Sequence, residues 1–323
     1  MANSSERYPK LLGDIGGTNV RLALQLTPDA PVSHILTLVV HDFAGAFQAI
    51  EHYLDQVGAK EGPLRPRTGF LGVAGPVLGD WIQLFNAPWG FSTESLRQML
   101  GLNELRIIND FTALALALPV LPPDELVQIG GEPPAPHLTK GLMGAGTGLG
   151  VSALLPAPGG LWVPMAGEGG HVTLPAADEA EVRLLDVLRA RYGHVSAERV
   201  LSGSGLIVLY ETYAQMAGRA VEPLTPADIT AHGLSGECDL CVAALHSFCR
   251  FFGTVAGNLA VTVGAQGGFY IGGGIVPKLG DFFVQSGFRA RFEAKGRYTD
   301  YLKRIPVFVI HSPYPALIGA SRA

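Results

Sequence analysis

Two glycine-rich turns have the residue types that can hold the oxygens of a phosphate group. The backbone N–H groups of consecutive glycines lie open, and together they form a positively polarised nest for an anion. The aspartate of the first turn could also bind Mg²⁺ through water, because this cation prefers oxygen ligands. Alternatively, each turn is a plain connection between strands, with a structural aspartate in the first. The first turn comprises Gly13, Asp14, Ile15, Gly16, Gly17, Thr18 and Asn19, and the second contains Gly144, Gly146, Thr147 and Gly148.

A third glycine turn, formed by Gly272, Gly273 and Gly274, follows an apolar run and could pass beside a nucleotide base or its sugar. Taken alone, it is explained better as the start of a helix. Two other kinds of nucleotide motif do not account for these turns. No lysine follows a glycine, as a P-loop requires, and neither Gly144 nor Gly146 begins a G-x-G-x-x-G/A pattern. A nucleotide site built from hairpin turns is therefore the hypothesis that survives.

Asn109 and Asp110 lie where the strand-like run LRII meets an apolar helical run. A carboxylate at such a junction can accept the proton of a substrate hydroxyl, which is the general base that phosphoryl transfer to an alcohol requires. The alternative is that Asp110 is a helix N-cap, a position that aspartate favours.

Three further side chains could hydrogen-bond the hydroxyls of a polyol. Glu168 and His171 lie on a glycine-lined segment, and Glu198 follows some thirty residues later. Carboxylate and imidazole groups can bind several neighbouring hydroxyls at once. Alternatively, Glu198 caps a helix and His171 is a buried core histidine, whereas Glu168, between glycines, is the hardest of the three to explain structurally.

The elements that must position these residues alternate between strands and helices, which indicates a mixed sheet with helices on its faces. Residues 10–26 form two apolar runs around a glycine pair, the pattern of a hairpin. Prolines between residues 119 and 136 predict a boundary near residue 120, after which a second α/β unit begins. Further strands are expected at 34–41, 68–74, 105–109, 138–144, 149–155, 161–165 and 268–272, and helices at 44–57, 92–100, 178–192, 203–217 and 238–263; a strand and a short helix are expected within 305–323.

Composition limits the partners and the compartment. The net charge is −5 and no block of lysine or arginine occurs, so nucleic acid and anionic membranes are poor candidates. The long uncharged runs 141–167 and 251–277 each contain eight glycines, which favours buried strands, turns and a core helix over membrane spans. With three cysteines and no apolar stretch at the amino terminus, a cytoplasmic protein is expected.

Taken together, the motifs resemble those of the bacterial glucokinases of the enteric type, a family of the hexokinase–actin–Hsp70 superfamily. The resemblance runs in order from about residue 10 to 320. It rests on the segments LLGDIGGTNVRLAL, IINDFTALALALP, GAGTGLGVS, GEGGHV, GHVSAERVLSG and GGGIVP.

This resemblance implies an α/β fold of two ribonuclease-H-like domains, a small one of residues 1–120 plus 311–323 and a large one of residues 121–310. The sugar would bind in an inter-domain cleft that closes around it. By position, Asp110 would be the catalytic base, and it would bind glucose together with Asn109, Glu168, His171 and Glu198. The first two glycine turns would grip the phosphates of ATP with Mg²⁺, and Gly272–Gly274 would lie near the adenosine. The resemblance also implies a homodimer.

Two alternatives stay open at this point. One is a kinase for another hexose or an amino sugar, as in the related ROK proteins. Those typically carry a cysteine-rich zinc site soon after the equivalent histidine, whereas no cysteine occurs here between His171 and Cys238. The other is a non-catalytic sugar sensor, against which the presence of both Asp14 and Asp110 argues.

Overall fold

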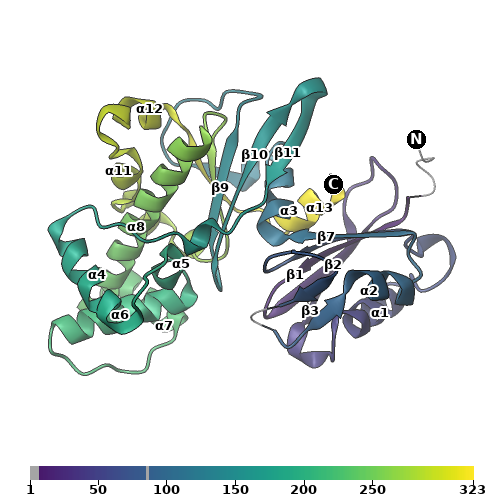
Figure 1. Ribbon diagram of the computed structural model, residues 1–323, viewed down its shortest axis with the longest axis horizontal. Coiled ribbons are helices and arrows are strands. Elements are labelled where there is room, and N and C mark those ends of the chain that lie inside the picture. The colour runs from purple at the N-terminus through teal and green to yellow at the C-terminus, as the bar shows by residue number, and fades with distance from the viewer. Residues whose placement is uncertain (1–6, 85–86) are drawn as a thin grey trace. The chain divides into compact units, whose positions relative to one another are not determined.

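The computed structural model describes residues 7–84 and 87–323 (Figure 1). The chain divides into two compact units. Unit 1 consists of Met1–Leu121, Trp162–Ala166 and Ser312–Ala323, and unit 2 consists of Pro122–Leu161 and Gly167–His311.

Unit 1 is built on a five-stranded sheet in the order β3-β2-β1-β4-β7. Antiparallel pairing joins β1 to β2 and β2 to β3, whereas β4 runs parallel to both β1 and β7. The predicted glycine hairpin is therefore confirmed, and a parallel strand lies beside it. The strands are β1 (Lys10–Ile15), β2 (Asn19–Gln25), β3 (Ser33–Val39), β4 (Thr68–Val73) and β7 (Glu104–Asn109), and a separate two-stranded sheet contains β5 (Trp81–Gln83) and β6 (Gly90–Ser92).

Helices cover both faces of this sheet, because its central strands are apolar on both sides. Leu11 of β1 belongs to a buried cluster with Ile50 of α1 (Ala46–Gln56) and Leu96 of α2 (Thr93–Met99). Its neighbour Leu12 faces the other way, since side chains alternate along a strand, and packs in a cluster with Leu317 of α13 (Pro315–Ser321). On that second face α13 also lies against α3 (Asp110–Ala117).

A six-stranded sheet has the order β11-β10-β9-β12-β13-β8, and unit 2 contains all of its strands except β11, of which it contains only Leu161. Here β9 and β10 form an antiparallel hairpin, and β12 runs parallel to both β9 and β13. The second glycine turn thus occupies the same place in its sheet as the first turn does in unit 1. The strands are β8 (Leu126–Gln128), β9 (Lys140–Ala145), β10 (Leu149–Ala157), β11 (Leu161–Met165), β12 (Phe269–Gly272) and β13 (Val307–Ile310).

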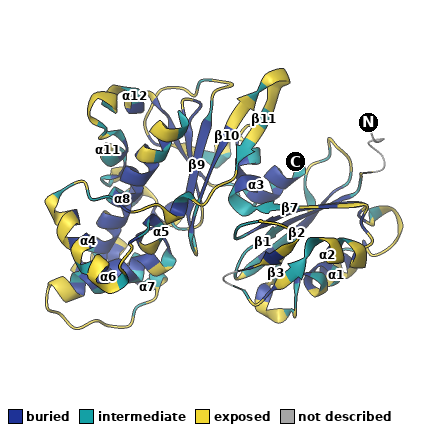
Figure 2. Ribbon diagram, viewed as in Figure 1, coloured by how far each residue is buried: buried dark blue, intermediate teal, exposed yellow. Residues whose placement is uncertain are grey.

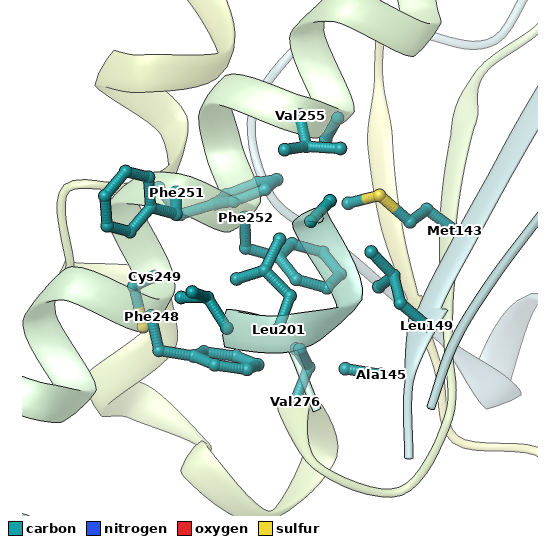
Figure 3. Close-up of a cluster of buried hydrophobic side chains, with 14 of the residues drawn as sticks. Met143, Ala145, Leu149, Leu201, Phe248, Cys249, Phe251, Phe252, Val255 and Val276 are labelled. Atoms are coloured by element: carbon teal, nitrogen blue, oxygen red, sulfur yellow. The ribbon is translucent and has the colours of Figure 1, made fainter. Parts of the chain in front are cut away.

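The core of unit 2 is organised around α8 (Asp239–Val263), which packs against β9, α6, α7 and α11 (Figure 1). Strand residues Met143 and Leu149 face Leu201 and Phe252 in this core (Figure 3). By length and composition α8 could cross a membrane, but 78% of its most apolar window is buried, as in a core helix (Figure 2). The other helices are α4 (Glu179–Tyr192), α5 (Ala197–Val200), α6 (Gly203–Met216), α7 (Pro226–Ser235), α9 (Val276–Leu279), α10 (Asp281–Gln285), α11 (Phe288–Glu293) and α12 (Thr299–Arg304).

Candidate active site

The first glycine turn joins β1 to β2 and places Asp14 at the end of β1. The Gly16 N–H donates to the Asn19 carbonyl over 2.9 Å, which closes the hairpin. Asp14 lies opposite Arg21 of β2, and its Oδ2 accepts a hydrogen bond from Arg21 Nη1 at 2.9 Å. Burial raises the pKa of Asp14, and the Arg21 guanidinium opposes this shift. Arg21 is thus a partner of Asp14 that the sequence analysis did not identify, although the pairing of the predicted hairpin could have revealed it.

Asp110 is the first residue of α3, at the point where β7 ends. The N-cap of this helix is Asn109, whose Oδ1 accepts hydrogen bonds from the N–H groups of Phe111 and Thr112. The Asn109 amide also donates to the Gly75 carbonyl at 3.3 Å. The alternative that Asp110 is the N-cap is therefore wrong. Asn109 instead fixes the first turn of the helix, where the Asp110 carboxylate is half-buried.

Gly72 of β4 lies between Asp14 and the first turn of α3, which contains Asp110. It pairs with Asp14 on one side and with Ile108 on the other. A methyl group at Gly72 would lie 3.3 Å from the Asp110 Cα, so the first turn of α3 rests directly on this residue. Because paired strands lie about 4.8 Å apart, Asp14 and Asp110 are close neighbours at the carboxyl edge of the parallel strands. Gly72 could not be identified from the sequence, since a glycine inside a strand can have several causes.

The second and third glycine turns lie against each other in unit 2. The Ile275 N–H donates to the Ala145 carbonyl at 3.2 Å. Gly273 has a φ of 79°, and a methyl group there would lie 2.3 Å from the same carbonyl oxygen. Only glycine fits this position.

The amino-terminal end of α6 supports the second turn as well. The Gly203 N–H donates to the Gly146 carbonyl at 2.9 Å. Gly203 was not identified from the sequence, although the Ser-Gly-Ser-Gly run 202–205 at the start of the predicted helix 203–217 indicates where a helix begins. Thr147, at the tip of the turn, is exposed.

Glu168, His171 and Glu198 come together in unit 2 on two segments that lie side by side. The Ala197 N–H donates to the Val172 carbonyl at 2.8 Å, which joins the segment after His171 to the one that contains Glu198. Glu168 and His171 are both exposed, so the alternative of a buried core histidine is wrong. Glu198 is not a helix cap either, because Ser196 caps α5 and the Glu198 Oε2 accepts the Leu149 N–H at 2.9 Å.

The two glycines between Glu168 and His171 allow a close approach to β10. A methyl group at Gly170 would lie 2.1 Å from the Leu149 carbonyl oxygen, and one at Gly169 would lie 2.7 Å from Val151. The segment therefore rests on the strand that leaves the second glycine turn. Glu168 and His171 are held beside that turn by these contacts.

The comparison with known proteins decides the family. The family model described as Glucokinase matches residues 11–323. A glucokinase from Aromatoleum aromaticum is 50% identical over 319 residues, which cover 99% of this chain and 95% of that protein. A glucokinase from Chromobacterium violaceum is 50% identical over 316 residues, with coverage of 98% and 89%. The crystal structure of a glucokinase from an Antarctic psychrotroph superposes with a TM-score of 0.85 at 35% identity and covers 97% of each chain.

The chain belongs to the glucokinase family. The predicted family, the predicted α/β fold class and the predicted enzyme class, a kinase that acts on glucose, are thereby confirmed. The role of each predicted site residue stays a prediction. The geometry adds that unit 1 brings Asp14, Asn109 and Asp110 together, and that unit 2 brings Glu168, His171 and Glu198 beside the second and third glycine turns.

The residues of the first glycine turn suit a metal ion that is coordinated mainly by the phosphate oxygens of a substrate and by water, with few ligands from the protein. Within residues 7–84 and 87–323, no group of three or more histidine, cysteine, aspartate or glutamate side chains could hold a metal ion. Mg²⁺ commonly keeps several waters and is bound through one or two carboxylates plus substrate phosphates. Asp14, a single carboxylate beside a glycine nest, matches this kind of site.

Proposed function

We propose that this chain transfers the terminal phosphoryl group of ATP to the 6-hydroxyl of D-glucose, with Asp110 as the general base. The observation that carries this proposal is the position of Asp110, at the first turn of α3 and directly beside Asp14 across Gly72. A proton acceptor is thereby held close to a turn that suits phosphate. Membership of the glucokinase family supports the same reaction.

In this reaction Asp110 accepts the proton of the 6-hydroxyl while the hydroxyl oxygen forms a bond to the terminal phosphorus. The bond from this phosphorus to the bridging oxygen breaks, and ADP leaves. Phosphoryl transfer of this kind depends mainly on positioning and on stabilisation of charge, without a covalent enzyme intermediate. Asn109 contributes by fixing the first turn of α3, and Glu168, His171 and Glu198 would bind the other hydroxyls of the sugar.

The nucleotide would be held by the three glycine turns. We propose that the backbone N–H groups of residues 13–19 and 144–148 bind the phosphates and that Gly272–Gly274 lie near the adenosine. Asp14 would hold Mg²⁺ through water. When bound, this cation neutralises charge on the phosphate oxygens.

The role of Asp110 can be tested with the variants Asp110→Ala and Asp110→Asn. Loss of a general base lowers the rate by about 10²–10⁴-fold, so we expect kcat to fall at least ~10²-fold. The far-UV circular dichroism spectrum and the thermal unfolding midpoint provide the control that each variant is folded. Near-normal kcat in both variants would contradict the assignment of the base.

A kinase for another hexose or an amino sugar is the second candidate, because these substrates differ from glucose in one hydroxyl or one amino group. A coupled assay of ADP release with glucose, mannose, fructose and glucosamine would rank them by kcat/KM. We expect glucose to rank first. If glucose binds but no sugar stimulates ADP release, the chain is a sugar sensor.

The quaternary structure and the compartment are further parts of the proposal. We infer a cytoplasmic homodimer, on the basis of the resemblance to the enteric-type family and of the cysteine content. Light scattering after size-exclusion chromatography would then give twice the chain mass of 34.1 kDa. A mass equal to one chain across the micromolar range would contradict the dimer.

A further inference from the structure

The second glycine turn makes a contact that has no connection with phosphate. At the end of this turn, the Leu149 N–H donates to Glu198 Oε2 over 2.9 Å. Glu198 Oε1 has no hydrogen-bond partner among the residues that the structure describes, so it is the oxygen left to accept a sugar hydroxyl. The turn therefore orients a side chain that the proposed function assigns to glucose.

Gly148 provides the space for this contact. A methyl group at residue 148 would lie 2.5 Å from Glu198 Oε2 and 3.2 Å from its Cδ. Carbon and oxygen atoms do not approach so closely without a bond, so a side chain at 148 would push the carboxylate away. The backbone of Gly148 has no positive φ, and its conformation is therefore open to alanine.

Gly146 lies two residues earlier in the same turn and differs in this respect. A methyl group at Gly146 would meet no atom within 4 Å, and its φ is not positive either. Both glycines thus lie in the same turn and have a backbone conformation that alanine can adopt. Only at Gly148 would the added methyl group collide with the carboxylate of Glu198.

We propose that Gly148 is a positioning residue for sugar recognition, which acts by allowing the Leu149 N–H to orient Glu198. This inference rests on the proposed function, because it takes Glu198 as a ligand of glucose. It changes the role expected for Gly148, from phosphate binding to sugar binding. Glu198, the proposed acceptor of a sugar hydroxyl, is consequently oriented by the same turn that is proposed to bind the nucleotide phosphates.

The test compares Gly148→Ala with Gly146→Ala in the full chain. Glucose binding is measured by calorimetry without nucleotide, and KM is measured for glucose and for ATP. A displaced charged acceptor weakens binding by about 10-fold or more, so we expect the Kd for glucose to rise by this factor in G148A. In G146A the Kd for glucose should stay within about 2-fold, since the new methyl group faces open space. Equal weakening of glucose binding in both variants, or none in G148A, would overturn the proposal.

A second variant separates displacement of Glu198 from a general disturbance of the turn. In Glu198→Asp the carboxylate is shorter by one methylene, about 1.5 Å, and withdraws from the methyl group at 148. We expect G148A to weaken glucose binding less than ~3-fold in the E198D background, because residues in contact are not additive. The same fold-change in both backgrounds would exclude the proposed mechanism.

The outcomes also distinguish this inference from the proposed function. If the wild-type chain neither binds nor phosphorylates glucose, the proposed function fails. If the wild type binds glucose and G148A binds it equally well, only the positioning role fails. Should G148A not accumulate as folded protein, the comparison of G148A/E198D with E198D decides: a Kd for glucose within about 3-fold of that of E198D supports the role, and a larger rise overturns it.

Discussion

The junction of β7 and α3 shows which properties of single residues can be inferred from sequence. The position of Asn109 and Asp110 between a strand and a helix was correctly predicted from the change of hydrophobic pattern. Which of the two caps the helix could not be predicted, because asparagine and aspartate are equally good N-caps. The backbone decides: Asn109 is extended, with φ −61° and ψ 145°, and Asp110 is already helical.

The same limit applies to Glu198, for which a capping role was a reasonable alternative. A carboxylate near a helix start can bind either its own helix or a distant backbone N–H group. Here Ser196 takes the cap, and Glu198 reaches a residue 49 positions away in the sequence. Only the folded chain brings Leu149 to that place.

The capping role of Asn109 leads to a prediction about both stability and rate. In Asn109→Ala the first turn of α3 loses its cap, which costs about 1 kcal/mol of stability. Because Asp110 lies in that turn, kcat should fall as well, by roughly 10-fold, as expected when a catalytic group loses its exact position. Asn109→Asp retains an oxygen cap and should keep most of the stability. Urea unfolding and steady-state kinetics check both effects, and an unchanged kcat in N109A would contradict the positioning role.

At the scale of elements, the long helices and most strands were predicted well, including the short β12, β13 and α13, whereas the three-residue strands and the short helices α9 to α12 were not predicted. The hairpin β1–β2 and the helices α1, α4, α6 and α8 agree with the predicted ranges to within a few residues. The three-residue strands β5, β6 and β8 have too few residues to show a period. For α7 a signal was present, because Thr225 and Asp228 form a capping box with Pro226 at the first helical position.

Contacts between helices and strands could not be predicted from sequence patterns. A glycine such as Gly72 can reflect a turn, a bulge or a close approach, and the letters do not distinguish these causes. In the structure the cause is close approach, since a methyl group there would lie 3.2 Å from the Ala113 Cβ and 3.3 Å from the Asp110 Cα.

Gly72→Ala should therefore disturb α3 while leaving the strand intact. The helix must move by a few tenths of an ångström, which we expect to lower kcat by about 3- to 10-fold, since small misplacements of reacting groups are costly. The free energy of unfolding should fall by about 1–2 kcal/mol, as for other overpacked sites. Gly79→Ala is the matched control in unit 1, because a methyl group there meets no atom within 4 Å. If G72A and G79A have equal kcat, Gly72 does not position Asp110.

At the scale of the whole chain, the two units repeat one strand order. A hairpin with a glycine turn lies beside two parallel strands in each, as β2-β1-β4-β7 in unit 1 and β10-β9-β12-β13 in unit 2. The sequence predicted an α/β fold with two glycine hairpins from local patterns. It could not predict the common order, because strand neighbours separated by many residues leave no periodic trace in the sequence.

Ion pairs also connect helices of unit 2 that are far apart in the sequence. Asp178 caps α4 and forms ion pairs with Arg250 of α8 and Arg291 of α11. The buried Glu181 accepts from Arg291 at 2.8 Å and from the Ala177 N–H at 2.7 Å. Two carboxylates and two guanidinium groups thus fasten one helix to two others.

The contribution of these ion pairs to the free energy of unfolding should depend on pH within a defined range. The Glu181 N–H, followed by Arg250 and Arg291, holds the pKa of Asp178 below its ordinary value. A carboxylate with a lowered folded-state pKa stabilises the fold above the pKa of the unfolded chain, and this contribution is lost as pH falls through the folded-state pKa. The loss therefore occurs below about pH 4, the ordinary value for aspartate.

Asp178→Asn isolates this charge, because asparagine remains a good N-cap. We expect D178N to lower the free energy of unfolding by on the order of 1 kcal/mol at pH 7, a typical value for ion pairs of limited burial. The difference from wild type should shrink as the pH falls from 7 to below about 4, because protonation of Asp178 in the folded wild type removes the same charge. Asp186→Asn is the control on the same helix, since the exposed Asp186–Arg189 pair should contribute almost nothing at either pH. Urea unfolding at a series of pH values from 7 down to well below 4 measures all three proteins, and a D178N effect that stays the same over this whole range would show that the charge of Asp178 is not its cause.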